Sequence, residues 1–445
     1  MPLVDYRRAA ATQPPGCAHP GTYAVTGWGR RFTWGCQKPM AYRFTLDDVA
    51  FLSSRRGARA LEVVGELDLT ASSMLADVTE ARSRYAPHDA ALIETVRCRR
   101  RAVGKLRHAT GLLLTDDALQ QATASPVAAR RALEIARRFP DAVVHDVTCS
   151  IGGELVELAA TKGIGGVVGS DIDRVRIRMA RHNTAIECPR QPTLLVADAL
   201  TPTSRADVVI ADPARRSGAG RVFRLDALTP PLLDVFMTYA GRVLVVKCAP
   251  GLDYHMLNSR FGFTGEVQVT SLDSSVREAC LWSGPGIAER RRATVMRTGV
   301  DGVRRIWEIT DAEPDEIEVE QPGTYLIDPD GAVVRAGLVR HYAHRHGLWQ
   351  LDPQIAYLTG DSVPAGERGF RIIERLASTG EKVLRTALAA HDCGSVEILV
   401  RGLDVDPDVL RKKLKLKGSR PLALVLTRIG RKGVAFVCEP GVRSD

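Results

Sequence analysis

Short apolar runs alternate with helical patterns through the middle of the chain. Between residues 141 and 285, five runs rich in Val, Ile and Leu are separated by segments whose apolar residues recur at helical spacing. Continuous apolar runs of this length are typical of strands buried on both faces, so the alternation predicts an α/β fold with a parallel, doubly wound sheet. The runs are AVVHDVT (142–148), GVVGSDI (166–172), PTLLVAD (192–198), ADVVIAD (206–212) and RVLVVKC (242–248).

Two later runs, EVQVTSL (266–272) and EACLWSG (278–284), lie close together in the sequence. We expect them to form an antiparallel pair that closes the sheet. The next segment, 286–330, begins in a tract with Gly, Pro and three consecutive Arg residues. This composition predicts a domain boundary followed by a β-rich connection.

The segment before the sheet, residues 40–140, carries apolar residues at helical spacing and predicts a helical domain. One helical stretch there has a basic tract from Arg97 to Arg107. Such a tract is either a solvated helix face or a face that contacts phosphates.

The segment after the connection, residues 331–445, mixes helical and strand patterns and predicts an α+β domain. Around its start, DPDGAVV (328–334) contains Asp-Gly, which predicts a hairpin turn. The further predicted elements are a helix over 376–391, a strand over 394–403, a helix that begins at Asp406-Pro407 and a hairpin over 421–440.

The composition is that of a globular protein of about two to four domains, with 445 residues, 45% hydrophobic and 25% charged. No apolar run approaches the roughly 18–20 residues that span a bilayer, and the chain start lacks the apolar core of a secretory signal. The nine cysteines are scattered and form no CxxC pair. These features favour a reduced, cytoplasmic protein.

Residues 1–39 differ from the rest because they are rich in Gly, Pro, Arg and Trp and lack periodicity. We expect either a flexible arm or a true start at Met40. Cys17, His19 and Cys36 could ligate a metal, but no fourth ligand lies at sensible spacing, so we expect no metal there.

Charge is divided unevenly along the chain. The net charge of +9 comprises +8 for residues 1–140, −6 for residues 141–330 and +7 for residues 331–445. Residues 401–433 hold ten basic and three acidic residues, and five of the ten lysines in the chain fall there. An Arg-rich background does not produce a local lysine cluster, so the basic flanks favour a polyanionic partner.

The first predicted strand ends in a turn rich in small residues. In HDVTCSIGGELVELA (145–159), Asp146 is followed by Thr148, Cys149, Gly152 and Gly153. Small residues allow a tight turn and the close approach of a ligand, and the next helix offers free backbone amides. The pattern is neither GxGxxG nor a Walker A loop, which disfavours NAD and a P-loop. The alternative is a purely structural turn.

Three later strands also end in an aspartate. Asp171, with Ile172 beside it, could accept hydrogen bonds from a ribose diol. Asp198, followed by Ala199, could meet an exocyclic amine or cap a helix. Asp212 ends the fourth strand, at the edge where the ligand crevice of such a sheet lies, and could act as an acceptor or a base.

The residues after Asp212 read Pro213, Ala214, Arg215 and Arg216. The two arginines could hold a phosphate, since a guanidinium binds phosphate in a bidentate manner.

Together these residues resemble the class I S-adenosylmethionine-dependent methyltransferases, over roughly residues 120–285. The turn from Asp146 to Gly153 resembles the first motif of that family, in the D-x-x-C-x-x-G-G form of trimethylguanosine synthase-like enzymes. The resemblance implies a Rossmann-like sheet in which this turn wraps the methionine part of the cofactor. It also implies that Asp171 binds the ribose and that Asp198 with Ala199 contacts the adenine.

Asp212-Pro213 resembles the start of the catalytic D/N-P-P-Y/F/W motif. Ala214 and Arg215 replace its second Pro and its aromatic residue, which stacks on the target base of amino-methylating enzymes, so methylation of an exocyclic amine is in doubt. The DPAR form is similar to the bacterial THUMP-like domain-containing methyltransferases. The segment ILVRGLDVDPDVLRKKLKLKG (398–418) resembles their C-terminal THUMP-like domain. THUMP domains are RNA-binding modules, mostly on tRNA-modifying enzymes.

This resemblance and the basic flanks predict a methyltransferase that acts on RNA, with tRNA or rRNA as partner, S-adenosylmethionine as cofactor, and no metal or membrane. The predicted RNA contacts are Arg216, Arg411, Lys412, Lys413, Lys415 and Lys417. Two alternatives stay open. One is a methyltransferase that acts on DNA, protein or a small molecule, and the other is a non-catalytic RNA-binding protein that senses the cofactor.

Two residues after the fifth strand have open roles. Cys248 is either a nucleophile, as in RNA 5-methylcytosine enzymes, or a small buried residue. Lys247 could approach a phosphate or cap the crevice. The oligomeric state stays open as well.

Overall fold

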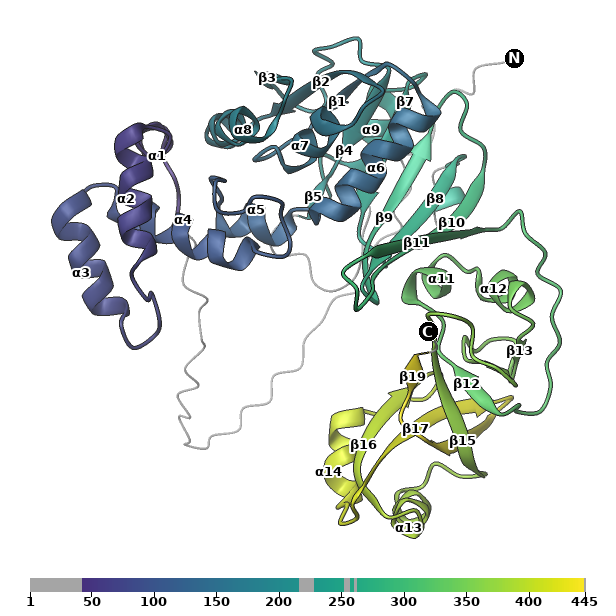
Figure 1. The fold of residues 1–445 in the computed structure, drawn as a ribbon. Helices are drawn as coiled ribbons and strands as arrows, with labels where there is room; N and C mark the ends of the chain where they lie inside the picture. Colours follow the sequence, from purple (N-terminus) through teal and green to yellow (C-terminus); the bar gives the residue numbers. More distant parts are fainter. Residues whose placement is uncertain (1–41, 216–227, 252–256, 260–261, 444–445) are drawn as a thin grey trace, which may run out of the picture. The chain divides into compact units, whose positions relative to one another are not determined.

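The computed structural model describes residues 42–215, 228–251, 257–259 and 262–443 (Figure 1). The arm expected at residues 1–39 and the predicted RNA contact Arg216 lie outside these residues.

In the described part of the chain six helices precede the sheet, as the spacing of apolar residues in 40–140 predicts. Thr45 begins the first helix with a capping box, in which its hydroxyl accepts from the Asp48 N–H and the Asp48 carboxylate accepts from the Thr45 N–H. The early helices share an apolar core that also includes Ile151 and Met179. The helices are α1 (Leu46–Leu52), α2 (Arg55–Gly65), α3 (Met74–Tyr85), α4 (Asp89–Ala102), α5 (Asp116–Gln121) and α6 (Ser125–Arg138).

The basic tract from Arg97 to Arg107 is used largely within the fold. Arg99 donates a hydrogen bond of 2.7 Å to the carbonyl oxygen of Leu112, and Arg107 pairs with Glu157 at 2.8 Å. These cations therefore hold segments of the chain together, a role that neither a solvated nor a phosphate-contacting face predicts.

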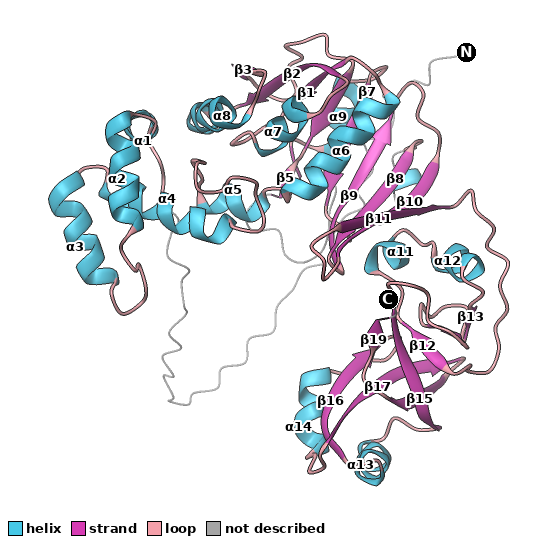
Figure 2. Cartoon of the chain, in the orientation of Figure 1, coloured by secondary structure: helices cyan, strands magenta, loops and turns pink. Residues whose placement is uncertain are grey.

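Nine strands form one sheet in the order β11-β10-β8-β9-β7-β4-β1-β2-β3 (Figure 2). The five strands from β7 to β3 run parallel, which confirms the predicted α/β class. The parallel strands and their helices are β1 (Ala142–Asp146), α7 (Gly153–Ala160), β2 (Ile164–Asp171), α8 (Arg174–Glu187), β3 (Thr193–Val196), β4 (Val208–Ala211), α9 (Leu232–Thr238) and β7 (Val243–Cys248). After Asp212, β5 (Ala214–Arg215) and β6 (Leu228–Thr229) form a separate antiparallel pair.

Alternate residues of the central strands face opposite sides of the sheet. Val208 and Ile210 of β4 belong to an apolar cluster with residues of α6 and α7. Val209 and Ala211 belong to a cluster on the opposite face, with residues of α9. Because helices cover both faces, each strand needs apolar residues on both sides, which explains the continuous runs in the sequence.

The sheet continues beyond its parallel part through β8 (Glu266–Leu272) and β9 (Ser275–Ser283), which pair antiparallel as predicted. It then extends past residue 285, because β10 (Arg290–Thr298) and β11 (Arg304–Thr310) join it. These strands come from the segment that we expected to connect two domains. The expectation rested on the arginine run, but Arg292 is only 4% exposed and is neutralised by glutamates.

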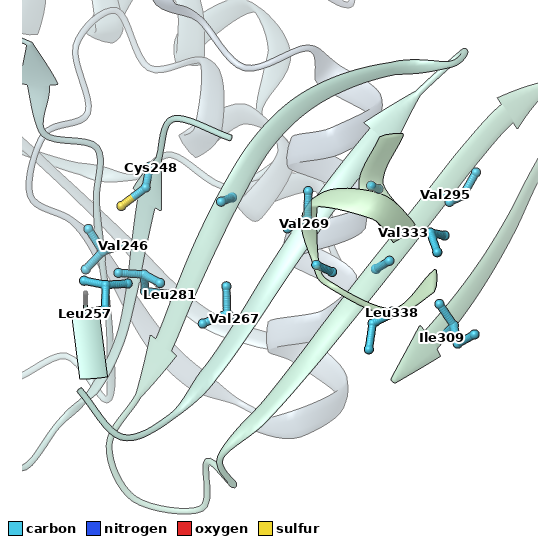
Figure 3. Packing of buried hydrophobic residues seen from close by; sticks show 14 of the residues in the cluster. Val246, Cys248, Leu257, Val267, Val269, Leu281, Val295, Ile309, Val333 and Leu338 are labelled. Atoms are coloured by element: carbon cyan, nitrogen blue, oxygen red, sulfur yellow. The ribbon is translucent and has the colours of Figure 1, made fainter. Parts of the chain in front are cut away.

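The cluster on the α9 face joins β7 to β11 with two further helices, α11 (Gly331–Arg335) and α12 (Val339–Arg345) (Figure 3). The pair Asp330-Gly331, at the start of α11, was expected to form a hairpin turn, and this prediction is wrong. Asp330 is the N-cap of α11, and its carboxylate accepts from the Ala332 N–H at 2.9 Å. An aspartate before an apolar segment can thus begin a helix as readily as a turn.

The C-terminal part forms a second, eight-stranded sheet in the order β13-β14-β12-β15-β18-β17-β16, with β19 beside β15. Its helix after Asp406 and its hairpin over 423–438 confirm the predicted elements. The elements are β12 (Tyr325–Ile327), β13 (Trp349–Gln350), β14 (Leu358–Gly360), β15 (Arg368–Leu376), α13 (Glu381–Ala390), β16 (Cys393–Val400), α14 (Pro407–Leu414), β17 (Arg420–Ile429), β18 (Lys432–Cys438) and β19 (Val442–Arg443). Of the helices described, none is both long and apolar enough to traverse a bilayer.

Candidate active site

Four aspartates gather at the carboxyl edge of the parallel strands. Asp146 ends β1, Asp171 ends β2, Asp198 follows β3 and Asp212 follows β4. Because these strands are parallel neighbours, their carboxyl ends lie at the same edge of the sheet. All four aspartates line one cavity of about 280 Å³, close to the lower end of the usual size of ligand pockets.

The turn after β1 forms one wall of this cavity. Asp146 accepts a hydrogen bond of 3.0 Å from the Thr148 N–H, which closes the turn. Gly152 has a φ of +86°, and a Cβ there would lie 3.2 Å from the Ala180 side chain. Only glycine adopts this conformation without strain, so Gly152 shapes the turn without lining the cavity. Gly153 lines the cavity and begins α7.

The second wall is formed by the end of β2. The Asp171 carboxylate accepts from the backbone N–H groups of Ser150 and Asp173, both at 2.9 Å, which fixes its position between the two loops. Ile172 is 72% exposed and lines the cavity, so it offers an apolar surface to a ligand. Asp173 caps α8, and its carboxylate accepts from the backbone N–H groups of Val175 and Arg176. Helix capping is therefore its role, and Asp171 is the carboxylate that lines the cavity.

Asp146 is the most deeply buried of the four aspartates, with 4% of its surface exposed. The pKa of Asp146 is raised to about 7, mainly by burial and also by the nearby Glu154 carboxylate, while Lys247 opposes the shift. This raised pKa means that the protein places too little positive charge around the Asp146 carboxylate to offset its burial. It is suited to a cationic ligand, which would favour its ionised form.

Asp212 is held by two contacts at the end of β4. Its backbone N–H donates to the Thr148 hydroxyl at 2.7 Å, and its Oδ2 accepts from the Lys247 ammonium at 2.6 Å. Asp198 accepts from the Leu200 N–H at 2.8 Å, so its carboxylate is fixed locally beside Ala199.

Of the predicted catalytic and cofactor-binding residues whose side chains the structure describes, Gly152 and Pro213 do not line the cavity. Pro213, the residue after Asp212, is buried. Arg215 lies in β5, and its side chain is outside the described part of the structure. Cys149 lines the cavity but is almost wholly buried, which raises its pKa well above the usual range.

Cys248 does not face the cavity. Its sulfur lies in the apolar cluster beside Val246 and Leu281 (Figure 3). Burial holds the pKa of the Cys248 thiol well above the usual range, so the nucleophilic thiolate is disfavoured. The structure thus favours the small buried residue over the nucleophile.

Sequence reasoning did not find several residues that line the cavity. Glu154 lies in the first turn of α7, and its signal is a carboxylate directly after two glycines in an apolar helix start. Gln121 and Thr123 reach the cavity from the helical domain. The pattern of apolar residues in the sheet strands gives no signal for cavity residues that a separate helical segment supplies.

A larger cavity of about 500 Å³ is lined by residues of α9, of the segment that precedes β8 and of the end of β9. It is lined mainly by apolar residues, including Phe236 and Phe263, and contains none of the strand-end aspartates. The smaller, acidic cavity is therefore the site at which we expect chemistry.

Comparison with known proteins assigns a family to this arrangement. Two curated relatives, from two Mycobacterium tuberculosis strains, are each 50% identical to this chain over 374 residues, which is 81% of this chain and 99% of each relative. Both are named an uncharacterized S-adenosylmethionine-dependent methyltransferase. The chain belongs to the S-adenosylmethionine-dependent methyltransferases. This confirms the resemblance, the enzyme class and the cofactor expected from the sequence.

Two family models and one solved structure add to this assignment. A "THUMP domain-like" family matches residues 367–440 of the methyltransferase, and a domain of unknown function, DUF8688, matches residues 45–102. A solved structure of a candidate methyltransferase from Porphyromonas gingivalis covers 89% of this chain and 99% of its own, with a TM-score of 0.68 and 17% identity. The likeness shows a shared fold over most of the chain.

The residues of the cavity fit S-adenosylmethionine, which carries positive charge on its sulfonium and ammonium groups. Three carboxylates, Asp146, Glu154 and Asp212, surround the Lys247 ammonium, and of these Glu154 also pairs with the buried Arg131. A cationic ligand therefore compensates the acidic excess. The exposed Ile172 gives the site an apolar wall, and the glycine turn gives it a second wall that a ligand can approach closely.

Proposed function

We propose that this methyltransferase modifies RNA, with tRNA or rRNA as its substrate. The observation that carries the proposal is a lysine patch, defined as Lys412, Lys413, Lys415 and Lys417, within the THUMP domain-like segment. All four side chains are exposed, and none forms an ion pair with a carboxylate in the described part of the chain.

Helix stability alone does not account for the lysine patch. Cations in the last turn of a helix are favoured by its macrodipole, which explains Lys412 and Lys413 in α14. Lys415 and Lys417 lie beyond the end of that helix and gain less from it. Arg411 differs from the lysines because it pairs with Asp408. Unpaired exposed cations are suited to phosphate contacts, which release counterions when they form.

The roles within the cavity belong to the same proposal. When bound, the cofactor supplies an electrophilic methyl group. We assign the turn from Asp146 through Thr148 and Cys149 to Gly153 to its methionine part, and Asp171 to its ribose. Ile172, Asp198 and Ala199 would hold its adenine, the first by apolar contact and the second by accepting a hydrogen bond.

The acceptor atom would lie beside Asp212, whose carboxylate accepts a hydrogen bond from it and orients it. Pro213 fixes the backbone behind Asp212, and Arg215 and Arg216 would bind phosphates of the RNA. The absence of an aromatic residue after Pro213 means that the base must be held by other groups. We also place the protein in the cytoplasm, because the described cysteines are free thiols.

Tritiated methyl transfer to total RNA tests the substrate. RNA from a deletion strain should accept more methyl groups than RNA from the wild-type strain, because its target position is unmodified. Equal acceptance by the two RNAs would contradict the proposal and favour DNA, protein or a small molecule. Mass spectrometry of nucleosides from both strains would then name the modified atom.

The lysine patch has its own test. Replacing its four lysines by Gln should weaken RNA binding at least about tenfold at moderate salt and lower the salt dependence of the binding constant. A control of equal charge loss replaces four exposed cations elsewhere, Lys162, Arg178, Arg181 and Arg205. If the control weakens binding equally, general attraction rather than the patch holds the RNA.

A further inference from the structure

Four charged side chains of alternating sign run from helix α6 to the cavity. Arg131 donates to the Glu154 Oε1 at 2.7 Å, the Glu154 Oε2 lies 3.8 Å from the Lys247 Nζ, and that ammonium donates to the Asp212 Oδ2 at 2.6 Å. We call these residues the charge ladder. Its members come from α6, α7, the end of β7 and the end of β4, so it joins four separate segments.

Three members of the charge ladder are buried, and only Asp212 is substantially exposed. Arg131, Glu154 and Lys247 are 4%, 7% and 8% exposed, whereas the Asp212 side chain is 40% exposed. On its other side Arg131 contacts Glu278 in a bidentate pair, so its guanidinium bridges two carboxylates. The ladder therefore begins in the core of the fold and ends at the cavity.

Lys247 keeps its charge in this setting. Burial alone would lower the pKa of Lys247, but the carboxylates of Asp212 and Glu154 outweigh burial and hold it well above its usual range. Buried ion pairs contribute little net stability, since desolvation cancels most of the attraction between the charges. A buried lysine beside a candidate catalytic carboxylate therefore calls for a reason other than stability.

The charge ladder holds one of the two carboxylate oxygens of Asp212. Its Oδ2 is held by Lys247, and its backbone N–H is held by Thr148. Among the described residues, the Oδ1 has no hydrogen-bond partner, while Asp212 itself lines the cavity. A carboxylate fixed in this way has its second oxygen available to a group in the cavity.

We propose that Lys247 is a positioning residue for methyl transfer, which holds the Oδ2 of Asp212 so that its Oδ1 accepts a hydrogen bond from the acceptor group of the substrate. Arg131 and Glu154 hold Lys247 in turn. This inference rests on the proposed role of Asp212 at the acceptor. On this inference Lys247 neither binds a phosphate nor caps the crevice, the two roles that the sequence left open. The buried Arg131 acts on the site through Glu154 and Lys247, although it does not line the cavity.

Substitution of Lys247 separates positioning from binding. Lys247→Met should lower kcat on RNA about 100-fold at saturating cofactor, because a small misplacement of a positioning group costs about this much. Its Kd for S-adenosylmethionine, measured by calorimetry, should rise by no more than about threefold, because removing a cation from the acidic cavity does not weaken the attraction of a cationic ligand. Lys247→Arg retains a cation and should recover kcat to within about tenfold of wild type.

Arg138→Met is the matched control, because Arg138 lies on the same helix as Arg131 and joins a buried ion cluster away from the cavity. It should lower the melting temperature but leave kcat unchanged. If Lys247→Met retains the wild-type kcat, or loses cofactor binding as severely as kcat, the inference is overturned. The same holds if Arg138→Met lowers kcat as much as Lys247→Met does.

A crystal structure of Lys247→Met with S-adenosylhomocysteine gives a readout that does not depend on the RNA substrate. The Asp212 carboxylate should leave its position in wild type, and an unmoved carboxylate overturns the inference even if activity is lost. If the wild-type enzyme transfers no methyl group to RNA, the proposed substrate fails. The position of Asp212 in this structure then decides the role of Lys247 separately.

Discussion

Helix α6 takes part in two buried groups of charged side chains that differ in the balance of negative and positive charge. Toward β8, β10 and β11, Glu134, Glu266 and Glu308 face four arginines, and every carboxylate has a cationic partner. Toward the cavity, four carboxylates face two cations. They are Asp146, Glu154, Asp212 and Glu278, against Arg131 and Lys247.

The pKa values follow this difference. Burial would raise the pKa of Glu134, but Arg137, Arg292 and Arg138 outweigh burial and hold it well below its usual range. Burial raises the pKa of Asp146 to about 7, and its neighbours do not compensate. A balanced buried cluster is complete in itself, whereas an acidic excess at a cavity indicates a site that needs a cation. The comparison thus separates a structural cluster from a ligand site on one helix.

The largest expected effect follows from removing the carboxylate at the acceptor. Asp212→Ala should lower kcat about 10³-fold, because the acceptor loses its orienting group and Lys247 loses its partner. Asp207→Ala is the control, since Asp207 lies at the opposite end of β4 and accepts from the Val143 N–H. Methyl transfer by the control should stay near the wild-type rate. Equal losses in both variants would show that Asp212 acts only through stability.

Breaking the balanced cluster should affect stability and leave the cavity unchanged. Glu134→Gln removes the carboxylate that faces Arg292, Arg137 and Arg138, and should lower the free energy of unfolding by about 3 kcal/mol. Cofactor affinity, measured by calorimetry at a temperature where the variant is folded, should match wild type. If Glu134→Gln also binds the cofactor more weakly than wild type, the balanced cluster is not purely structural and the distinction between the two clusters is contradicted.

The acidic excess predicts a smaller effect that depends on pH. Because the folded-state pKa of Asp146 is raised from 3.8 to about 7, the folded protein holds this proton more tightly than the unfolded chain does. Stability from this group is therefore present below about pH 4 and is lost as the pH rises to about 7. Asp146→Asn mimics the protonated group and should stabilise the cofactor-free protein by about 2 kcal/mol at pH 8, with little change near pH 4.

Thermal unfolding of Asp146→Asn at both pH values checks this prediction. Asp141→Asn is the control, because Asp141 is exposed at the opposite end of β1. The control should unfold like wild type at both pH values. A variant of Asp146 that is no more stable than wild type at pH 8 would contradict the pKa shift.

The sequence indicates the parallel sheet and its acidic edge because both depend on local signals. Continuous apolar runs predict buried parallel strands, and parallel strands bring their last residues to one edge. Asp146, Asp171, Asp198 and Asp212 could therefore be expected at one site before any coordinates were known. The glycine turn is equally local, since Gly152 needs a positive φ for the chain to enter α7.

Other features depend on contacts between distant segments and leave no local signal. Arg292 looks like part of an exposed linker, yet it is buried because Glu134, 158 residues earlier, neutralises it. Gln121 lines the cavity from a helix of the preceding domain. Arg131 lies in an ordinary amphipathic helix, and only the packing of α6 against α7 and β9 shows that it belongs to the charge ladder.

Calorimetric titration of S-adenosylmethionine tests the central claim most directly, namely that the cavity with the acidic excess holds the cofactor. The titration compares wild type with Asp171→Ala and with Asp173→Ala, which removes the neighbouring helix cap but no carboxylate that lines the cavity. Asp171→Ala should bind about 10- to 100-fold more weakly, as expected for the loss of hydrogen bonds to a charged group. Asp173→Ala should bind like wild type. Unchanged affinity in Asp171→Ala, or equal losses in both variants, would contradict the placement of the cofactor.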